Sequence, residues 1–365
     1  MKPTIIRYAI PGNESGGLLH IYGEGTASNV VLYCGGWPDG VEPFTPMAMR
    51  LATSSSTETK DGCFVGVTCW PGFDFESYQQ LKFRGFKRGG YNFNEVLCCI
   101  REAAKQLFVE YYRQRVHDFK ETPQFTVIFH DFGVLPGLMF VNRSIEEDYF
   151  AEHTPNRIVL LDVLLEPHPD FRTQFWHLSP YSVHELLVYV AYRGTFACAF
   201  AMLRFLSETI GLLTFRIMYM FVIMLRLAPL HPKGSDMMLL EERKMDHHHL
   251  IYTFYPYYYL FRAMFFNKKE LVHGCLPLNL VKTPILYLYE TADYIHLVLR
   301  SKREWWKKMF HDHRSFAILQ QEERDGTSDC RVVKVKGAGH WMYCLRPEVC
   351  EAEIRKFLNA SMTRG

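Results

Sequence analysis

The sequence lacks the features that mark several large classes of protein. Lys and Arg number 41 and Asp and Glu 39, a formal net charge of +2, and no Lys/Arg run resembles a phosphate-binding arm. The chain therefore has no overall field that would attract a polyanion, and we expect no nucleic-acid partner. It also lacks internal repeats. With 48% hydrophobic and 22% charged residues, its 365 residues do not have the composition of a disordered chain.

Signs of secretion are missing as well. The ten cysteines form no CxxC pair and no spacing typical of a disulfide framework. The amino-terminal residues do not run into the apolar stretch of a signal peptide. Both absences favour a reducing compartment, and we expect a cytoplasmic protein.

No apolar run is long enough to cross a membrane, although residues 187–230 come close. Five charged residues interrupt them: Arg193, Arg204, Glu208, Arg216 and Arg226. The longest uncharged piece, residues 194–203, is about half of the ~20 residues that a bilayer requires. We expect buried helices of a lid here. The alternative is a cap surface that makes peripheral contact with lipid.

Apolar stretches of strand length alternate with helical ones, which predicts a mostly parallel sheet covered on both faces. The expected strands are residues 4–8, 18–22, 30–34, 63–69, 125–130, 158–162, 285–289 and 331–335. Turn residues between the first two predict an antiparallel hairpin at the sheet edge. Helices are best signalled at 92–112 and 347–358.

The alternation stops over residues 166–278, which are rich in Tyr, Met and Phe at helical spacing. We therefore predict an α/β core made of residues 1–165 and 279–365. Residues 166–278 are expected to form a helical cap, inserted between the sixth and seventh strands. An excess of aromatic residues, 15% of the chain, is concentrated partly in this segment.

Asp131 follows an apolar strand and precedes Gly133, at the start of an expected helix. A sharp strand–turn–helix bend of this kind raises one side chain and exposes the next backbone N–H beside it. A carboxylate in that place can attack carbon and form an ester. The alternative is an aspartate that caps the helix.

A candidate general base, His340, comes directly after the last strand, among glycines that let the chain turn inward. Asp293, in the loop after the seventh expected strand, is our choice to orient it. Glu290 and Asp162 also end strands and are alternatives. The backbone amides of Trp37, in a glycine-proline turn, and Phe132, beside Asp131, are candidates for an oxyanion hole.

Together and in this order, these segments resemble the α/β-hydrolase superfamily, and within it the aspartate-nucleophile branch of epoxide hydrolases and haloalkane dehalogenases. Residues 130–133 (His-Asp-Phe-Gly) are similar to that branch's His-Asp-Trp-Gly elbow. Residues 36–38 (Gly-Trp-Pro) are similar to its His-Gly-x-Pro turn, and 337–341 (Gly-Ala-Gly-His-Trp) match its histidine loop. The resemblance implies the α/β-hydrolase fold, with a mostly parallel eight-stranded sheet, flanking helices and an inserted cap.

The resemblance also implies a mechanism without a cofactor. Asp131 would attack an electrophilic carbon and form an alkyl ester, which water activated by His340 would hydrolyse. In epoxide hydrolases cap tyrosines protonate the leaving oxygen, and Tyr255 and Tyr258 are our candidates. The expected partner is a small apolar substrate between cap and core. A metal is not expected, because the adjacent side chains of residues 247–249 (His-His-His) point in different directions.

Two departures from the family pattern keep a second function open. Phe129 stands where the elbow usually has a small residue, and Gly35 replaces the histidine of the oxyanion turn. Either change favours a non-catalytic protein of the same fold that binds a hydrophobic ligand or partner. A dehalogenase, with Trp37 as a halide donor, or an esterase on the same scaffold is a third hypothesis.

Overall fold

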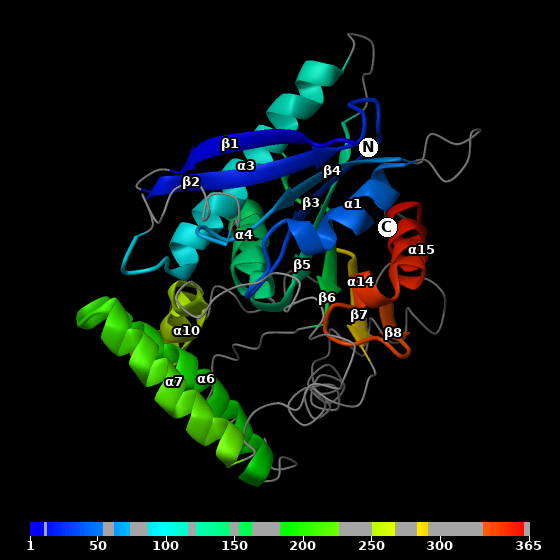
Figure 1. Ribbon diagram of the computed structural model, residues 1–365. Helices are drawn as coiled ribbons and strands as arrows, with labels where there is room; N and C mark the ends of the chain where they lie inside the picture. Colours follow the sequence, from blue (N-terminus) through cyan, green and yellow to red (C-terminus); the bar gives the residue numbers. More distant parts are fainter. Residues whose placement is uncertain are drawn as a thin grey trace.

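The chain is built around one eight-stranded sheet, seen edge-on at the centre of the computed structural model (Figure 1). The structure describes residues 1–10, 13–53, 62–73, 87–115, 122–146, 153–162, 183–225, 250–266, 283–290 and 331–360. The strands are β1 (Thr4–Ile10), β2 (Asn13–Tyr22), β3 (Asn29–Cys34), β4 (Cys63–Thr68), β5 (Gln124–His130), β6 (Arg157–Leu161), β7 (Ile285–Glu290) and β8 (Arg331–Val335). Each overlaps one of the eight expected strands.

The strand order is β1-β2-β4-β3-β5-β6-β7-β8. β1 and β2 form the expected antiparallel hairpin, β2 pairs antiparallel with β4, and every other pair is parallel. The parallel strands β3 and β4 are buried at every position, which accounts for their unbroken apolar sequences. The predicted mostly parallel α/β sheet is confirmed.

Helices cover both faces of this sheet (Figure 1). α3 (Phe93–Gln114) and α4 (Val134–Glu146) pack together on one face, and α1 (Thr45–Ala52) and α15 (Pro347–Leu358) on the other. α3 begins at a capping box, in which Asn92 and Glu95 each accept a hydrogen bond from the other's backbone N–H.

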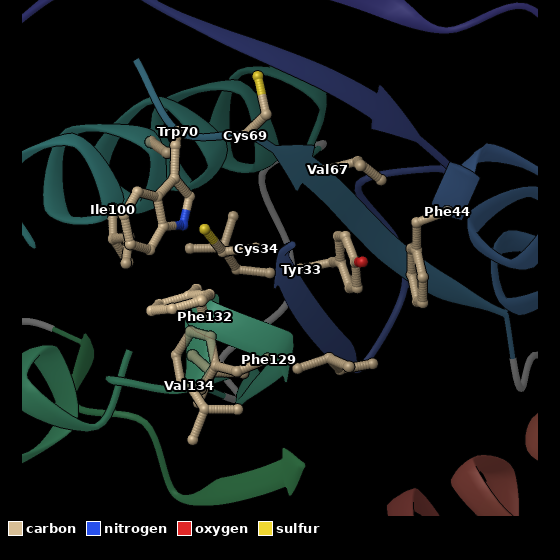
Figure 2. Packing of buried hydrophobic residues seen from close by; sticks show 14 of the residues in the cluster. Tyr33, Cys34, Phe44, Val67, Cys69, Trp70, Ile100, Phe129, Phe132 and Val134 are labelled. Carbon is tan, nitrogen blue, oxygen red and sulfur yellow. The ribbon is translucent and has the colours of Figure 1, made fainter. Parts of the chain in front are cut away.

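Consecutive residues of β3 show how one strand serves both layers (Figure 2). Tyr33 stacks on Phe44, with ring centroids 3.7 Å apart and planes within 7°. Cys34 points to the opposite side, toward Trp70 and Ile100. All five side chains are buried, so the strand is held by packing on both faces.

The helical elements described between β6 and β7 lie together at one end of the molecule (Figure 1). They fall within the segment predicted to form a cap, and we call them the cap helices: α6 (Val183–Phe205), α7 (Glu208–Met224), the short 3-10 helix η4 (Ile251–Phe254) and α10 (Tyr255–Phe266). α6 packs along α7 and also contacts α10 and η4. Among the helices that the structure describes, none is long and apolar enough to cross a membrane.

Phe129, the bulky residue expected to crowd the elbow, has a matching space in α4. Its side chain is fully buried in β5. Gly137 faces the ring so closely that an added β-carbon would lie 2.5 Å from it. The absence of a side chain at Gly137 therefore makes room for the ring of Phe129.

The close contact between Gly137 and Phe129 predicts that a methyl group added at position 137 destabilises the protein. Gly137→Ala is expected to lower the free energy of unfolding by about 1–3 kcal/mol, because the new β-carbon overlaps the Phe129 ring. In a Phe129→Ala background the same change is expected to be neutral or stabilising. Urea denaturation of the two single variants and the double variant measures this coupling.

Gly194→Ala in α6 is the matched control. A β-carbon there meets no atom within 4 Å, and removing a helical glycine is expected to stabilise the chain by about 0.5–1 kcal/mol. Equal costs for Gly137→Ala with and without the Phe129 ring would show that the two residues do not compensate each other.

Candidate active site

The bend after β5 holds Asp131 in a strained conformation. β5 ends at His130, and Asp131 has φ of 50°, in the left-handed region that few residues other than glycine adopt. The 3-10 turn η2 (Asp131–Gly133) then leads directly into α4. The carboxylate is thereby raised beyond the end of the strand, with its side chain 13% exposed.

One carboxylate oxygen of Asp131 is held by the turn after β3. The backbone N–H of Trp37 donates a hydrogen bond to Oδ2, at 2.9 Å. A β-carbon on Gly36 would lie 2.7 Å from that oxygen and would press against the backbone nitrogen of Phe132. Gly36 therefore lets the Trp37 turn come close to both the carboxylate and the backbone nitrogen of Phe132.

His340 lies on the other side of the same carboxylate. Its Nε2 is 3.9 Å from Oδ1 of Asp131, a separation that a small shift or one bridging water would span. Its Nδ1–H donates to Oδ2 of Asp162 at 2.6 Å. The imidazole is thus placed between two carboxylates, one at each ring nitrogen.

Asp162, one of the two alternatives to Asp293, is the acid that contacts His340 in this structure. It follows β6 directly, has φ of 63°, and is 3% exposed. Its backbone is held by β7, because its N–H donates to the carbonyl of Leu288 and its carbonyl accepts from the Tyr287 hydroxyl. Asp293 lies outside the described residues, and Glu290 ends β7. Nδ1 of His340 is therefore bonded to Asp162, and the expectation for Asp293 stays a prediction.

The charges around His340 stabilise its protonated form. Burial alone would lower its pKa, but the hydrogen bond and charge of Asp162, followed by the charges of Asp131 and Asp39, raise the pKa to about 9. Any change that neutralises Asp131 removes one of these charges and lowers the pKa of the ring.

Beneath the site, a buried network joins the three turns that form it. The carboxylate of Asp39 accepts hydrogen bonds from the indole N–H of Trp341 and the hydroxyl of Tyr343, and its Oδ2 lies 3.1 Å from Nδ1 of His130. Nε2 of His130 lies 3.1 Å from the carbonyl oxygen of His340. The residue preceding Asp131 therefore also supports the histidine loop. Sequence reasoning missed this role, although Asp39 and His130 both lie within the motifs.

Aromatic residues of the cap helices lie over Asp131. The ring of Phe196 is 5.2 Å from that of Trp37, and Tyr257 lies 5.2 Å from Trp37 and 4.8 Å from Phe132. Tyr192, one turn before Phe196 in α6, is near enough that the charge of Asp131 contributes to raising its pKa, after burial and Tyr219. Helical spacing from Phe196 is the only signal in the sequence for Tyr192.

The two tyrosines expected as acids have other contacts. Tyr255 is fully buried, and its hydroxyl donates to the carbonyl of Pro71 at 3.0 Å. Tyr258 packs on Phe200, and the guanidinium of Arg204 lies 5.4 Å from its ring centroid. A hydroxyl already bonded to a backbone carbonyl is a poor proton donor, which disfavours Tyr255 as the acid. The role expected for Tyr258 stays a prediction.

Comparison with known proteins shows the fold. No family model matches the chain, and no curated protein matches it. Solved structures match over nearly the full length. An epoxide hydrolase of the α/β-hydrolase superfamily, from metagenomes of hot environments, is 15% identical with a TM-score of 0.52, covering 99% of this chain and 100% of that one. A haloalkane dehalogenase variant from Bradyrhizobium elkanii is 13% identical with a TM-score of 0.56, covering 98% and 96%.

Epoxide hydrolase A from Mycobacterium thermoresistibile is 15% identical with a TM-score of 0.50, covering 98% of this chain and 99% of that one. The chain has the α/β-hydrolase fold. In an α/β hydrolase the bend after β5 carries the nucleophile and the loop after the last strand carries the base. Asp131 and His340 occupy these two places.

The second departure from the family pattern, Gly35, also has a local explanation in this α/β-hydrolase fold. A β-carbon at Gly35 would lie 3.1 Å from both Cβ of Asp39 and the hydroxyl oxygen of Tyr33. The space beside the turn is therefore already filled by buried polar side chains. Tyr33 donates to the hydroxyl of Tyr343, which in turn donates to Asp39. The turn is tied to the core without a histidine at position 35.

The charges around His340 predict a pH-dependent stability. A pKa of about 9, against an ordinary value of 6.5, means that the folded chain holds this proton more tightly than the unfolded chain. The resulting stabilisation is fully present below about pH 6.5 and is lost as the pH rises through about 9. Urea denaturation of the wild type and of His340→Gln is expected to show a stability difference that shrinks over this interval. A difference independent of pH would contradict the charge arrangement.

Proposed function

We propose that the chain is a hydrolase that opens epoxides through a covalent ester on Asp131. One observation carries the proposal. The carboxylate of Asp131 lies between a backbone N–H donor at one oxygen and the ring of a buried His–Asp pair at the other. A carboxylate that served only to cap α4 would not require this arrangement.

The first step would be attack by Oδ1 of Asp131. Oδ2 is engaged by the Trp37 amide, which leaves Oδ1 to approach an epoxide carbon in line with the breaking C–O bond. A new bond joins Oδ1 to that carbon, and the epoxide oxygen leaves as an alkoxide on the neighbouring carbon. Asp131 becomes a neutral ester.

The second step would be hydrolysis of this ester. Its formation removes the charge of Asp131, and the pKa of His340 falls, so that the neutral ring can accept a proton from water. The hydroxide attacks the ester carbon, and negative charge develops on Oδ2 beside the amides of Trp37 and Phe132. The bond between the ester carbon and Oδ1 then breaks, and protonated His340 returns its proton to the departing alkoxide, which leaves as the diol. Asp131 is left in its acid form.

The alkoxide of the first step needs a proton, and we assign the donor to Tyr192. Burial, Tyr219 and Asp131 raise its pKa, so the hydroxyl keeps its proton until a strong base forms beside it. An alkoxide released next to Asp131 is such a base. The tyrosinate would regain its proton when the acid form of Asp131 is released in the second step.

The substrate class follows from the residues around Asp131. Phe132 and Trp37, whose backbones flank Asp131, contact the rings of Phe196 and Tyr257, and the guanidinium of Arg193 lies 5.7 Å from the Phe132 ring centroid. Such aromatic surfaces favour an apolar, uncharged epoxide over a charged one. The steps above use side chains and amides of this chain and call for no cofactor.

The dehalogenase hypothesis is weakened by the position of Trp37. Its indole N–H donates to the hydroxyl of Thr253 at 3.0 Å, whereas a halide site would need that N–H for the leaving ion. The non-catalytic hypothesis loses its main support because Phe129 and Gly35 both fit their surroundings.

A cytoplasmic location is part of the proposal, supported by the eight described cysteines, all of which are free thiols.

Trapping the ester tests the proposed function. His340→Gln is expected to react with a lipophilic epoxide and to stop at the ester, because no base activates water. Intact-mass spectrometry should then show a gain equal to the mass of the epoxide, located by peptide mapping at Asp131. The matched control is His340→Gln combined with Asp131→Asn, which should gain no mass.

Two results would overturn the covalent mechanism. One is a folded His340→Gln variant that gains no mass with any member of an epoxide and haloalkane panel. The other is an adduct that persists when Asp131 is replaced.

The role of Tyr192 can be tested separately. Tyr192→Phe is expected to slow alkylation of Asp131 by about 10²–10⁴-fold, the usual range for loss of a general acid. Ester hydrolysis should change little, and single-turnover kinetics separate the two steps. Tyr255→Phe is the control, since its hydroxyl bonds to Pro71 and its loss should affect stability more than alkylation. A larger kinetic effect at Tyr255 would reverse the assignment.

A further inference from the structure

The outer face of α7 carries an apolar stripe that the described part of the chain leaves exposed. Ile210, Leu213, Ile217, Met220 and Met224 recur at intervals of three and four residues, which puts them on one side of the helix. Each is at least 40% exposed, and Met220 and Met224 reach 60% and 64%. An apolar surface of this extent in a folded protein usually marks a contact with a partner or a membrane.

The opposite side of α7 is buried within the protein. Gly211, Leu212, Phe215 and Val222 are buried, and α7 packs along α6 (Figure 1). The helix is therefore apolar on both sides, and only one side contributes to the fold. The pair formed by α6 and α7 lies at one end of the molecule.

The charges on this helix favour a lipid surface over a protein partner. Arg216 is the only charged residue from 209 to 225, and it is exposed. The one acidic residue of α7, Glu208, accepts a hydrogen bond from the hydroxyl of Tyr252. Arg262, on α10, which packs against α6, is also exposed. Apolar side chains with basic residues and few acids are typical of a helix that lies in the interface of an anionic bilayer.

A chain of aromatic rings connects this helix with the nucleophile. Phe215 and Tyr219, on the inner side of α7, lie 6.0 and 6.4 Å from Phe196. Phe196 contacts Trp37, whose amide holds Asp131. Packing of these rings therefore connects α7 with the turn that holds Asp131.

We propose that the outer face of α7 docks the protein on membranes that contain anionic lipid, with the helix lying parallel to the surface. The stripe enters the acyl boundary while Arg216 reaches the headgroups. The substrate would then be a lipophilic epoxide taken up from the bilayer. This identity of the substrate rests on the proposed function. The docking itself does not depend on catalysis.

Vesicle sedimentation of the full chain tests this surface. We expect the wild type to bind vesicles of phosphatidylcholine mixed with phosphatidylglycerol more tightly than vesicles of phosphatidylcholine alone. Replacing Leu213, Ile217 and Met220 together by Gln should lower the partition coefficient at least about tenfold. The matched control replaces Val109, Ile145 and Val349 by Gln, residues of α3, α4 and α15 that are 62%, 42% and 43% exposed. It should bind as the wild type does.

Further measurements distinguish docking through α7 from misfolding of the variants and from an effect of catalysis. Circular dichroism and thermal unfolding establish that both triple variants fold. Phe221→Trp supplies a fluorescent reporter on α7, whose emission should shift to the blue when anionic vesicles are added. Asp131→Asn should still bind vesicles, so a failure of the proposed chemistry leaves the docking result intact.

A wild type that stays in the supernatant with both kinds of vesicle would overturn the proposal. So would a wild type that forms dimers in solution, dissociated by the α7 substitutions, without binding vesicles. That result would show that a second copy covers the stripe.

Discussion

The hydrogen bond between Asp162 and His340 is the constraint on which the rest of the site depends. It joins the end of β6 to the loop after β8, across the intervening strand β7. Without it, burial would favour a neutral His340 with no fixed ring orientation. With it, Nδ1 carries the proton, and Nε2 is directed toward Asp131. The Asp39–His130 network supports the same loop from below, so the imidazole is held from two sides.

The strands and the sharp bend at Asp131 could be predicted because their causes are local. Strands buried on both faces require apolar runs, and the bend at Asp131 requires Gly133 and a short polar segment. The choice among Asp293, Glu290 and Asp162 could not be made locally. Each of the three lies at or beyond the end of a neighbouring strand, and local sequence does not show which carboxylate will face His340. The positive φ of Asp162, which turns its side chain, is not encoded by a glycine or another evident signal.

The cap shows a similar limit. Composition indicated tyrosines over the site, but which of them approach Asp131 depends on the rotation and position of each helix. Tyr255 looked suitable in the sequence, yet α10 directs it into the cluster around Trp70 and Tyr91. Tyr192, one turn before Phe196 in α6, packs on Phe196, whose ring contacts Trp37. Phe129 is likewise understood only together with Gly137. The bulky side chain at position 129 fits because position 137, in the next helix, has no side chain.

The central claim is that an oxygen atom of Asp131 ends up in the product. A single turnover in water enriched in ¹⁸O, with the enzyme in excess over a lipophilic epoxide, tests it most directly. The account predicts a diol without the heavy isotope and an Asp131 peptide that has gained it, because water attacks the ester carbon and not the substrate. Heavy oxygen in the diol of the first turnover, with none in Asp131, would contradict the account.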